Sequence, residues 1–134
     1  MKDEDEPPAP VGDPAGLPSL RERTTAFALR ITRMYAALPT SKVAQTLGFQ
    51  AFRAGTSVGA QYREACRSRS DAELVSKLES VLQELDETDY WLELLAEEKV
   101  LKPQRLAGLR KECDELTAML VTGVKKIKAR RKRQ

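Results

Sequence analysis

Residues 53–65, Arg-Ala-Gly-Thr-Ser-Val-Gly-Ala-Gln-Tyr-Arg-Glu-Ala, decide the fold class of this chain. Glycine, threonine, serine and valine are modest or poor helix formers. The apolar residues of the stretch nevertheless repeat at helical spacing, as Val58 and Tyr62 do. A helix that keeps two glycines, here Gly55 and Gly59, usually needs them for close backbone packing. The stretch therefore predicts a helix that is contacted on two sides, by the bundle core and by a second element, for which another subunit is one candidate.

Helical periodicity extends on both sides of this stretch and predicts three further helices. We expect helices over residues 19–38, 41–67 and 71–99, and a fourth that begins near Pro103. Ser19-x-x-Glu22 and Ser70-x-x-Glu73 are capping-box patterns, and Pro39 ends the first helix. The short connections favour antiparallel neighbours. The sequence thus predicts an all-α protein, an antiparallel up-down-up-down four-helix bundle over residues 19–128.

Charge is concentrated at the two ends of the chain. The net charge is +3, but residues 1–19 carry −4 and residues 125–134 carry +7, so the body between them is neutral. Residues 1–18 also hold five of the seven prolines, which predicts a disordered acidic leader. Residues 125–134 form a predicted basic tail. The two ends could attract each other or bind different partners.

The residue types that are missing argue against several functional classes. The chain has no histidine, the commonest general base and metal ligand, and no phosphate-binding Gly-rich loop with its lysine. We therefore expect no enzyme activity, no catalytic residues, no metal and no cofactor. The carboxylate pair Glu84/Glu87 is interpreted as part of a solvated helix face. No apolar run reaches the length of a membrane helix, and no secretory signal is visible. We expect a cytoplasmic protein with no membrane role, whose Cys66 and Cys113 stay reduced.

Three motifs resemble one known family. They are the 53–65 stretch, residues 70–78 (Ser-Asp-Ala-Glu-Leu-Val-Ser-Lys-Leu) and residues 87–92 (Glu-Thr-Asp-Tyr-Trp-Leu). Together they resemble the small bacterial four-helix bundle proteins known as 23S rRNA intervening-sequence proteins, although Gln61 stands where that family more often has asparagine. The resemblance implies a homo-oligomeric barrel, a pentamer. One branch, the accessory variability determinant of diversity-generating retroelements, binds a reverse transcriptase and nucleic acid, which makes both of them candidate partners.

Two sets of candidate site residues follow. The nucleic-acid-binding set (RNA or DNA) is Arg63, Arg67, Arg69, Lys125, Lys126, Lys128, Arg130, Arg131, Lys132 and Arg133. The oligomer-interface set is Phe52, Gly55, Gly59, Trp91 and Leu95, with the alternative that Trp91 covers an edge of its own bundle. The predicted function is a non-catalytic nucleic-acid-binding accessory protein, with a protein-interaction scaffold as the alternative. In that alternative the tail is a solvated helix end. Arg53 is instead expected to pair with acids such as Asp86 or Asp89.

Overall fold

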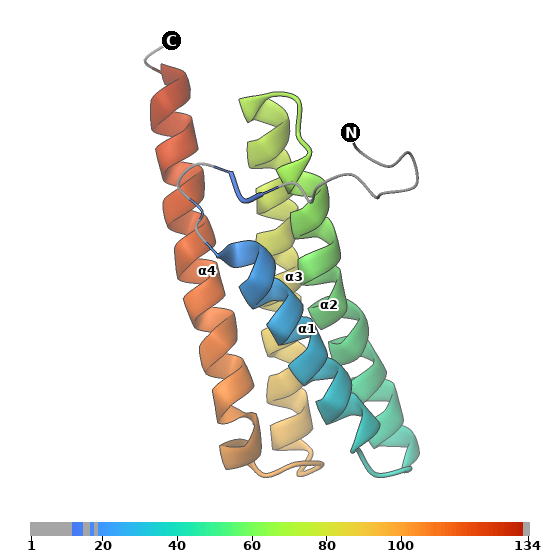
Figure 1. Ribbon diagram of the computed structural model, residues 1–134. Helices are drawn as coiled ribbons and strands as arrows, with labels where there is room; N and C mark the ends of the chain where they lie inside the picture. The colour runs from blue at the N-terminus through green and yellow to red at the C-terminus, as the bar shows by residue number, and fades with distance from the viewer. Residues whose placement is uncertain (1–11, 15–16, 18, 133–134) are drawn as a thin grey trace, which may run out of the picture.

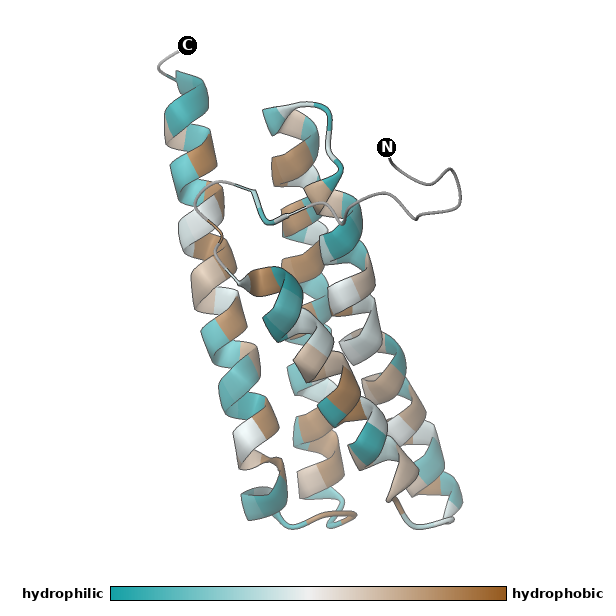
Figure 2. Ribbon diagram, in the orientation of Figure 1, coloured by the Kyte–Doolittle hydropathy of each residue, from teal (hydrophilic) through white to brown (hydrophobic). Residues whose placement is uncertain are grey.

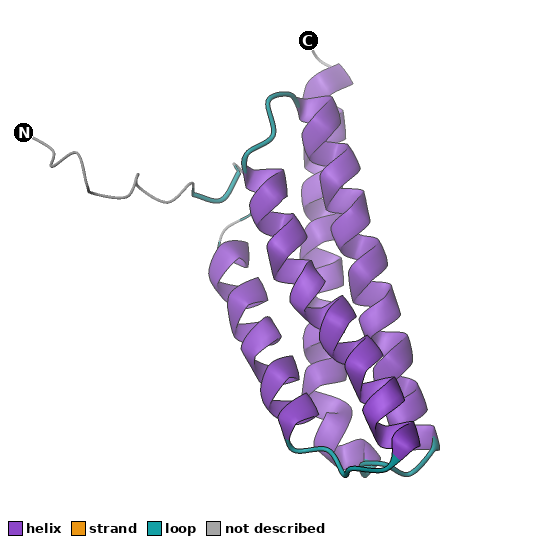
Figure 3. Ribbon diagram, turned by 90° about the vertical axis from the view of Figure 1, so that its right-hand side faces the viewer, coloured by secondary structure: helices purple, strands orange, loops and turns teal. Residues whose placement is uncertain are grey.

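The computed structural model describes residues 12–14, 17 and 19–132, and within them every regular element is an α-helix. The helices are α1 (Leu20–Ala36), α2 (Lys42–Cys66), α3 (Asp71–Glu97) and α4 (Pro103–Lys132). Figure 1 shows them lying side by side as a bundle, and Figure 3 shows the connecting loops gathered at its two ends. The predicted all-α, four-helix architecture is confirmed.

The side-chain contacts show how the helices are paired. Gly55 of α2 lies against Ile31, and Gly59 lies against Thr24, so the contacts run backward along α1 as they run forward along α2. The chain turns back at each of its three loops (Figure 1). As a result, the α2–α3 loop and the C-terminal end of α4 lie at the same end of the bundle.

Of the two predicted N-caps, Ser70 forms one and Ser19 does not, while Ser41, at the expected start of the second helix, also caps α2. Ser41 Oγ accepts a hydrogen bond from the backbone N–H of Ala44, and Ser70 Oγ accepts one from Glu73. Ser19 differs, because it has a φ of 62° and makes no side-chain cap. The first turn of α1 is instead capped from a distance by Asp13, whose Oδ1 accepts from the backbone N–H of Arg21 at 2.8 Å.

The described part of the predicted acidic leader is packed against the bundle. Leu17 is 1% exposed and lies against Gly123 of α4, where a side chain would occupy the same space. Asp13 also accepts a hydrogen bond from the hydroxyl of buried Tyr62 at 2.5 Å. Leu17 and Asp13 therefore belong to the folded unit, whereas most of residues 1–18 lie outside the described residues.

The glycines of the deciding stretch serve a contact inside the chain. Gly55 and Gly59 are buried, and they let α2 approach α1 closely at Ile31 and at the backbone of Thr24. Leu95 is completely buried in the core. All three residues are buried within the single chain, so the structure removes them from the predicted oligomer interface. The physical reason is that α1 occupies the second side of α2.

Apolar residues recur along each helix (Figure 2), and residues from all four helices form the buried core. The largest fully buried side chains include Tyr62, Phe27 and leucines from α3 and α4. Among the described residues, four large apolar side chains remain about half exposed: Leu29, Val43, Phe49 and Tyr90. Because such a side chain would favour burial, these four mark apolar surface that the single chain leaves uncovered.

Candidate nucleic-acid interface

The last turns of α4 carry a row of cations on a regular helix rather than on a separate tail. The helix continues to Lys132, and its end is hydrophilic in Figure 2. The side chains of Lys125, Lys126, Arg131 and Lys132 are exposed, and none of them makes an ion pair with another described residue. Arg133, which the sequence also predicted, lies outside the described residues.

Two of the predicted phosphate-binding cations are engaged within the chain. Arg130 donates two hydrogen bonds to Asp71, from Nη2 at 2.7 Å and from Nε at 3.2 Å. Lys128 Nζ lies 3.2 Å from a carboxylate oxygen of Glu79. Both pairs join α4 to α3. Arg130 and Lys128 therefore form ion pairs that connect the end of α4 to α3. Because both are already paired with a carboxylate, they are weaker candidates for binding phosphate.

The structure brings a second group of cations to the same end of the bundle. Arg67 and Arg69 follow α2 and are exposed, and Asp71, which binds Arg130 of α4, is only two residues further on. Figure 3 shows the α2–α3 loop beside the end of α4. We define the basic end by its six exposed cations: Arg67, Arg69, Lys125, Lys126, Arg131 and Lys132.

Arg63 lies one turn before the basic end and points elsewhere. Its Nη2 donates to the Thr25 hydroxyl of α1 at 3.2 Å, while the side chain remains exposed. It is therefore positioned on the α1–α2 face rather than on the α2–α3 loop. Arg63 remains accessible to a ligand, but the geometry does not place it among the six cations of the basic end.

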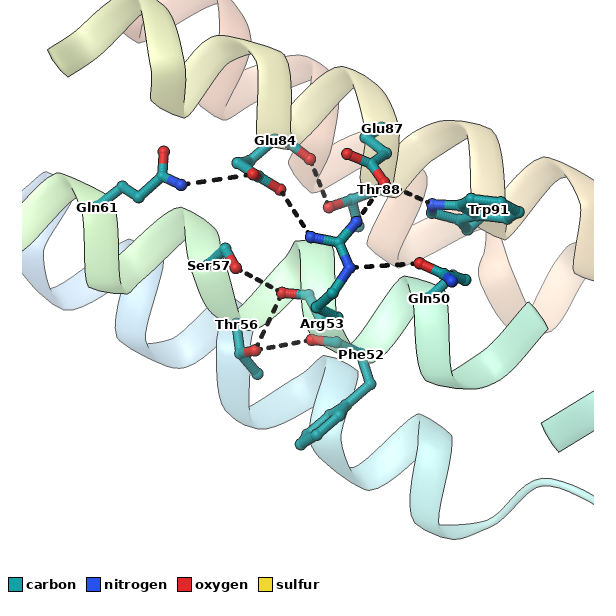
Figure 4. Close-up of polar contacts among 10 residues, drawn as sticks. All are labelled: Gln50, Phe52, Arg53, Thr56, Ser57, Gln61, Glu84, Glu87, Thr88 and Trp91. Carbon is teal, nitrogen blue, oxygen red and sulfur yellow. Dashed lines mark hydrogen bonds and ion pairs between the residues drawn. The ribbon is translucent and has the colours of Figure 1, made fainter. Parts of the chain in front are cut away.

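About halfway along the helices, a polar cluster centred on Arg53 joins α2 to α3 (Figure 4). The Arg53 guanidinium forms an ion pair with Glu87 and lies 3.9 Å from Glu84. Gln61 donates to the second oxygen of Glu84 at 3.4 Å. Arg53 thus pairs with acids of α3, as expected, but with Glu84 and Glu87 rather than with Asp86 or Asp89. The interpretation of Glu84/Glu87 as a solvated face is corrected, because both carboxylates bind α2.

The two aromatic residues of the predicted oligomer interface contact neighbours in their own chain. The Trp91 indole N–H donates to Glu87 at 3.1 Å and so joins the Arg53 cluster (Figure 4). The Phe52 ring stacks on Tyr35 of α1 with 5.0 Å between ring centroids. Both side chains are only partly buried. Phe52 and Trp91 are therefore the two members of that predicted set that keep exposed surface.

The described part of the chain contains two free thiols and no cluster of metal ligands. Burial raises the pKa of the Cys113 thiol to about 12 and also raises the pKa of Cys66. Both cysteines are free. No group of three potential ligands that could hold a metal ion is formed by the described residues. None of the described helices combines the length and the apolar character needed to cross a membrane.

Comparisons with known proteins identify the relatives of this bundle. The family model described as 23S rRNA-intervening sequence protein matches residues 20–122, from the first residue of α1 to a point in α4 that precedes its basic last turns. The fold is similar to a crystal structure of a protein with unknown function from the S23 ribosomal protein family of Bacteroides thetaiotaomicron. That similarity has a TM-score of 0.77 at 30% sequence identity, and it covers 82% of this chain and 98% of the other. No curated protein matches. The chain therefore belongs to the family of 23S rRNA-intervening sequence proteins.

Proposed function

We propose that this protein is a non-catalytic, cytoplasmic accessory protein that binds nucleic acid through its basic end. The observation that carries the proposal is the gathering of Arg67 and Arg69 beside Lys125, Lys126, Arg131 and Lys132, with no acid paired to any of the six side chains among the described residues. Like charges gathered at one end of the bundle repel one another. A polyanion relieves that repulsion and releases its own counterions on binding.

The mechanism is electrostatic. Lysine and arginine side chains at the basic end neutralise phosphates without reading base edges, so affinity falls steeply with salt and depends little on sequence. The paired Arg130 and Lys128 connect the end of α4, which carries four of the six cations, to α3. RNA and DNA share the phosphate chemistry, and family membership favours RNA.

We also propose that the antiparallel bundle is the protomer of a homo-oligomer, a pentameric barrel by its family resemblance. Each copy would contribute one basic end, and several linked ends bind a long polyanion more tightly than one. Partly exposed Phe52 and Trp91, with half-exposed Phe49 and Tyr90, supply apolar surface for contacts between subunits. Light scattering on the full chain measures the subunit number, and a monomer at micromolar concentration would reject this part of the proposal.

Fluorescence anisotropy with a labelled structured RNA, measured from low to high salt, tests the nucleic-acid proposal. The test variant replaces four cations by glutamine: Lys125→Gln, Lys126→Gln, Arg131→Gln and Lys132→Gln. The control variant removes four exposed cations elsewhere: Lys42→Gln, Lys99→Gln, Lys102→Gln and Lys111→Gln. If all four test residues contact phosphate, the slope of log affinity against log salt becomes shallower by about 3, at about 0.7 per contact for single strands and 0.9 for B-form DNA. Equal losses in both variants, or no binding at low salt, would reject the proposal.

A protein-interaction scaffold is the second candidate function. The half-exposed Val43, Phe49 and Tyr90 favour it, because apolar side chains on a surface are typical of a docking face. A reverse transcriptase is the partner that the family resemblance suggests. The variant that lacks all four test cations separates the two functions. If the protein is a scaffold, this variant should bind the partner protein as tightly as the unaltered chain does.

A further inference from the structure

A hollow lies between α1 and α4 at the opposite end of the bundle from the basic end. The start of α1 lies near α4, and the helix leans away from it toward its C-terminus (Figure 1). The hollow has a volume of about 340 Å³ and a floor that includes Met34, Leu101 and Leu109. Its remaining walls carry three arginines, Arg30, Arg33 and Arg105, and no acidic residue. We call it the arginine groove.

None of the three arginines has an acid partner among the described residues. Arg30, Arg33 and Arg105 are all exposed and make no ion pair within that part of the chain. Arg23, at the other end of α1, shows the usual arrangement: its guanidinium lies 2.7 Å from Glu112 and 2.9 Å from Glu115 of α4. The same pair of helices thus neutralises one arginine fully and leaves three uncompensated around a single hollow.

Arg30 contacts α4 at a glycine, Gly108, where an acidic side chain would have provided an ion-pair partner. Gly108 is exposed in the interior of α4, where glycine weakens a helix and alanine would be the ordinary choice. A Cβ at this position would lie 3.0 Å from Arg30 Nη2, with no other atom close by. The Arg30 side chain therefore lies against the α4 backbone at Gly108. Gly108 precedes Glu112 by four residues, which is about one helical turn. No side chain at position 108 supplies Arg30 with a carboxylate, as Glu112 does for Arg23.

We propose that the arginine groove binds the phosphate monoester of a nucleotide. Guanidinium groups bind phosphate oxygens through paired N–H donors, and three of them match the charge of a monoester dianion better than that of a diester. The apolar floor at Met34, Leu101 and Leu109 offers contact to the flat body of the ligand, and the volume falls in the range of small-molecule sites. A site with these features differs from the basic end, where exposed cations surround no apolar floor.

The groove and the basic end can be tested separately because they share no residue. Arg105 and Lys125 are 20 positions apart on α4, which corresponds to about 30 Å along the helix. The proposal does not depend on nucleic-acid binding at the basic end. Loss of either activity leaves the other measurable.

Calorimetric titration of the full chain with guanosine, guanosine 5′-monophosphate and inorganic phosphate tests the proposal. We expect the nucleotide to bind at least tenfold more tightly than the nucleoside or phosphate alone. The variant Arg30→Gln, Arg33→Gln, Arg105→Gln should lose at least tenfold in affinity, whereas the control Lys42→Gln, Lys102→Gln, Lys111→Gln should not. Equal binding of nucleoside and nucleotide would overturn the proposal. So would a synthetic acidic peptide that binds the same arginines more tightly than the nucleotide.

A single substitution provides a second test that does not weaken the helix. Gly108→Glu supplies Arg30 with an internal carboxylate, as Glu112 does for Arg23, and should reduce nucleotide affinity about tenfold or more. Gly108→Gln is the matched control of similar size without charge, and it should bind more tightly than Gly108→Glu. Equal affinity in the two variants would overturn the electrostatic argument. A 5′-phosphorylated tetranucleotide that binds better than GMP would assign the phosphate to a strand end, and weaker binding would assign it to a free nucleotide.

Discussion

Replacing Gly55 by alanine should destabilise the bundle, although alanine is the better helix former. A Cβ at position 55 would lie 2.8 Å from Ile31 Cγ1, 3.0 Å from Cγ2 and 3.2 Å from Cβ. Ile31 is completely buried, and a β-branched side chain has one strongly preferred χ1 rotamer in a helix, so it has little freedom to move aside. Separating α1 from α2 by a few tenths of an ångström is then the remaining response.

The expected magnitude is the difference between two opposing effects. Overpacking a core costs about 1–3 kcal/mol, and the contact with three Ile31 atoms places this case near 2–3 kcal/mol. Exchange of glycine for alanine in a helix recovers about 1 kcal/mol. The net loss is therefore about 1–2 kcal/mol, which lowers the melting temperature by about 5 °C for a chain of this length.

Urea denaturation at one fixed protein concentration measures this loss, since oligomer stability depends on concentration. Gly108→Ala is the matched control, because its Cβ would meet only the flexible tip of Arg30. It should gain about 0.5–1 kcal/mol. A Gly55→Ala variant as stable as the unaltered chain would refute the packing argument. A variant that dissociates into subunits without a loss of unfolding free energy would return Gly55 to the oligomer interface.

Three further predictions concern polar contacts and a thiol. Tyr62→Phe should cost about 1–2 kcal/mol in urea denaturation, because it removes the hydroxyl that donates to Asp13. Arg130→Gln should cost less than about 1 kcal/mol, and less again in high salt, because its pair with Asp71 is partly exposed. Cys113, with its pKa raised to about 12 by burial, should resist thiol reagents at pH 8 until the chain unfolds. Because the unfolded thiol has a pKa of about 8.5, its contribution to stability is complete below that pH and declines as pH rises toward 12, which denaturation at pH 7 and pH 10 would reveal.

Local signals account for the parts of the fold that were predicted correctly. Ser41 and Ser70 each cap a helix by accepting a hydrogen bond from the backbone N–H three residues later. A contact over three residues can be predicted from the local sequence alone. Ser19 has the same capping-box pattern, but Asp13 caps the first turn of α1 instead. Its carboxylate accepts from the backbone N–H of Arg21, eight residues further along the chain. That competition was not visible in the sequence, because it depends on where Leu17 packs against Gly123.

The candidate site was predicted in composition but not in arrangement. The basic run of residues 125–134 and the arginines at positions 67 and 69 were both chosen from charge alone. Only the structure separates Arg130 and Lys128, which pair with α3, from the cations that remain free among the described residues. The arginine groove was missed altogether. Arg30, Arg33 and Arg105 stand singly in the sequence and meet only because α1 and α4 are neighbours.

The sequence by itself determined the number of helices, their approximate ends, the neutral body and the charged termini. These properties follow from hydrophobic period, capping residues and charge, each of which acts over a few neighbouring positions. The tertiary structure alone decided which face of α2 receives α1, so that Gly55 and Gly59 serve a contact within the chain. It also decided which cations are neutralised. Both outcomes depend on residues that are distant in sequence, because packing and Coulomb forces act through space. The hydrophobic pattern of a helix does not specify which other helix it packs against.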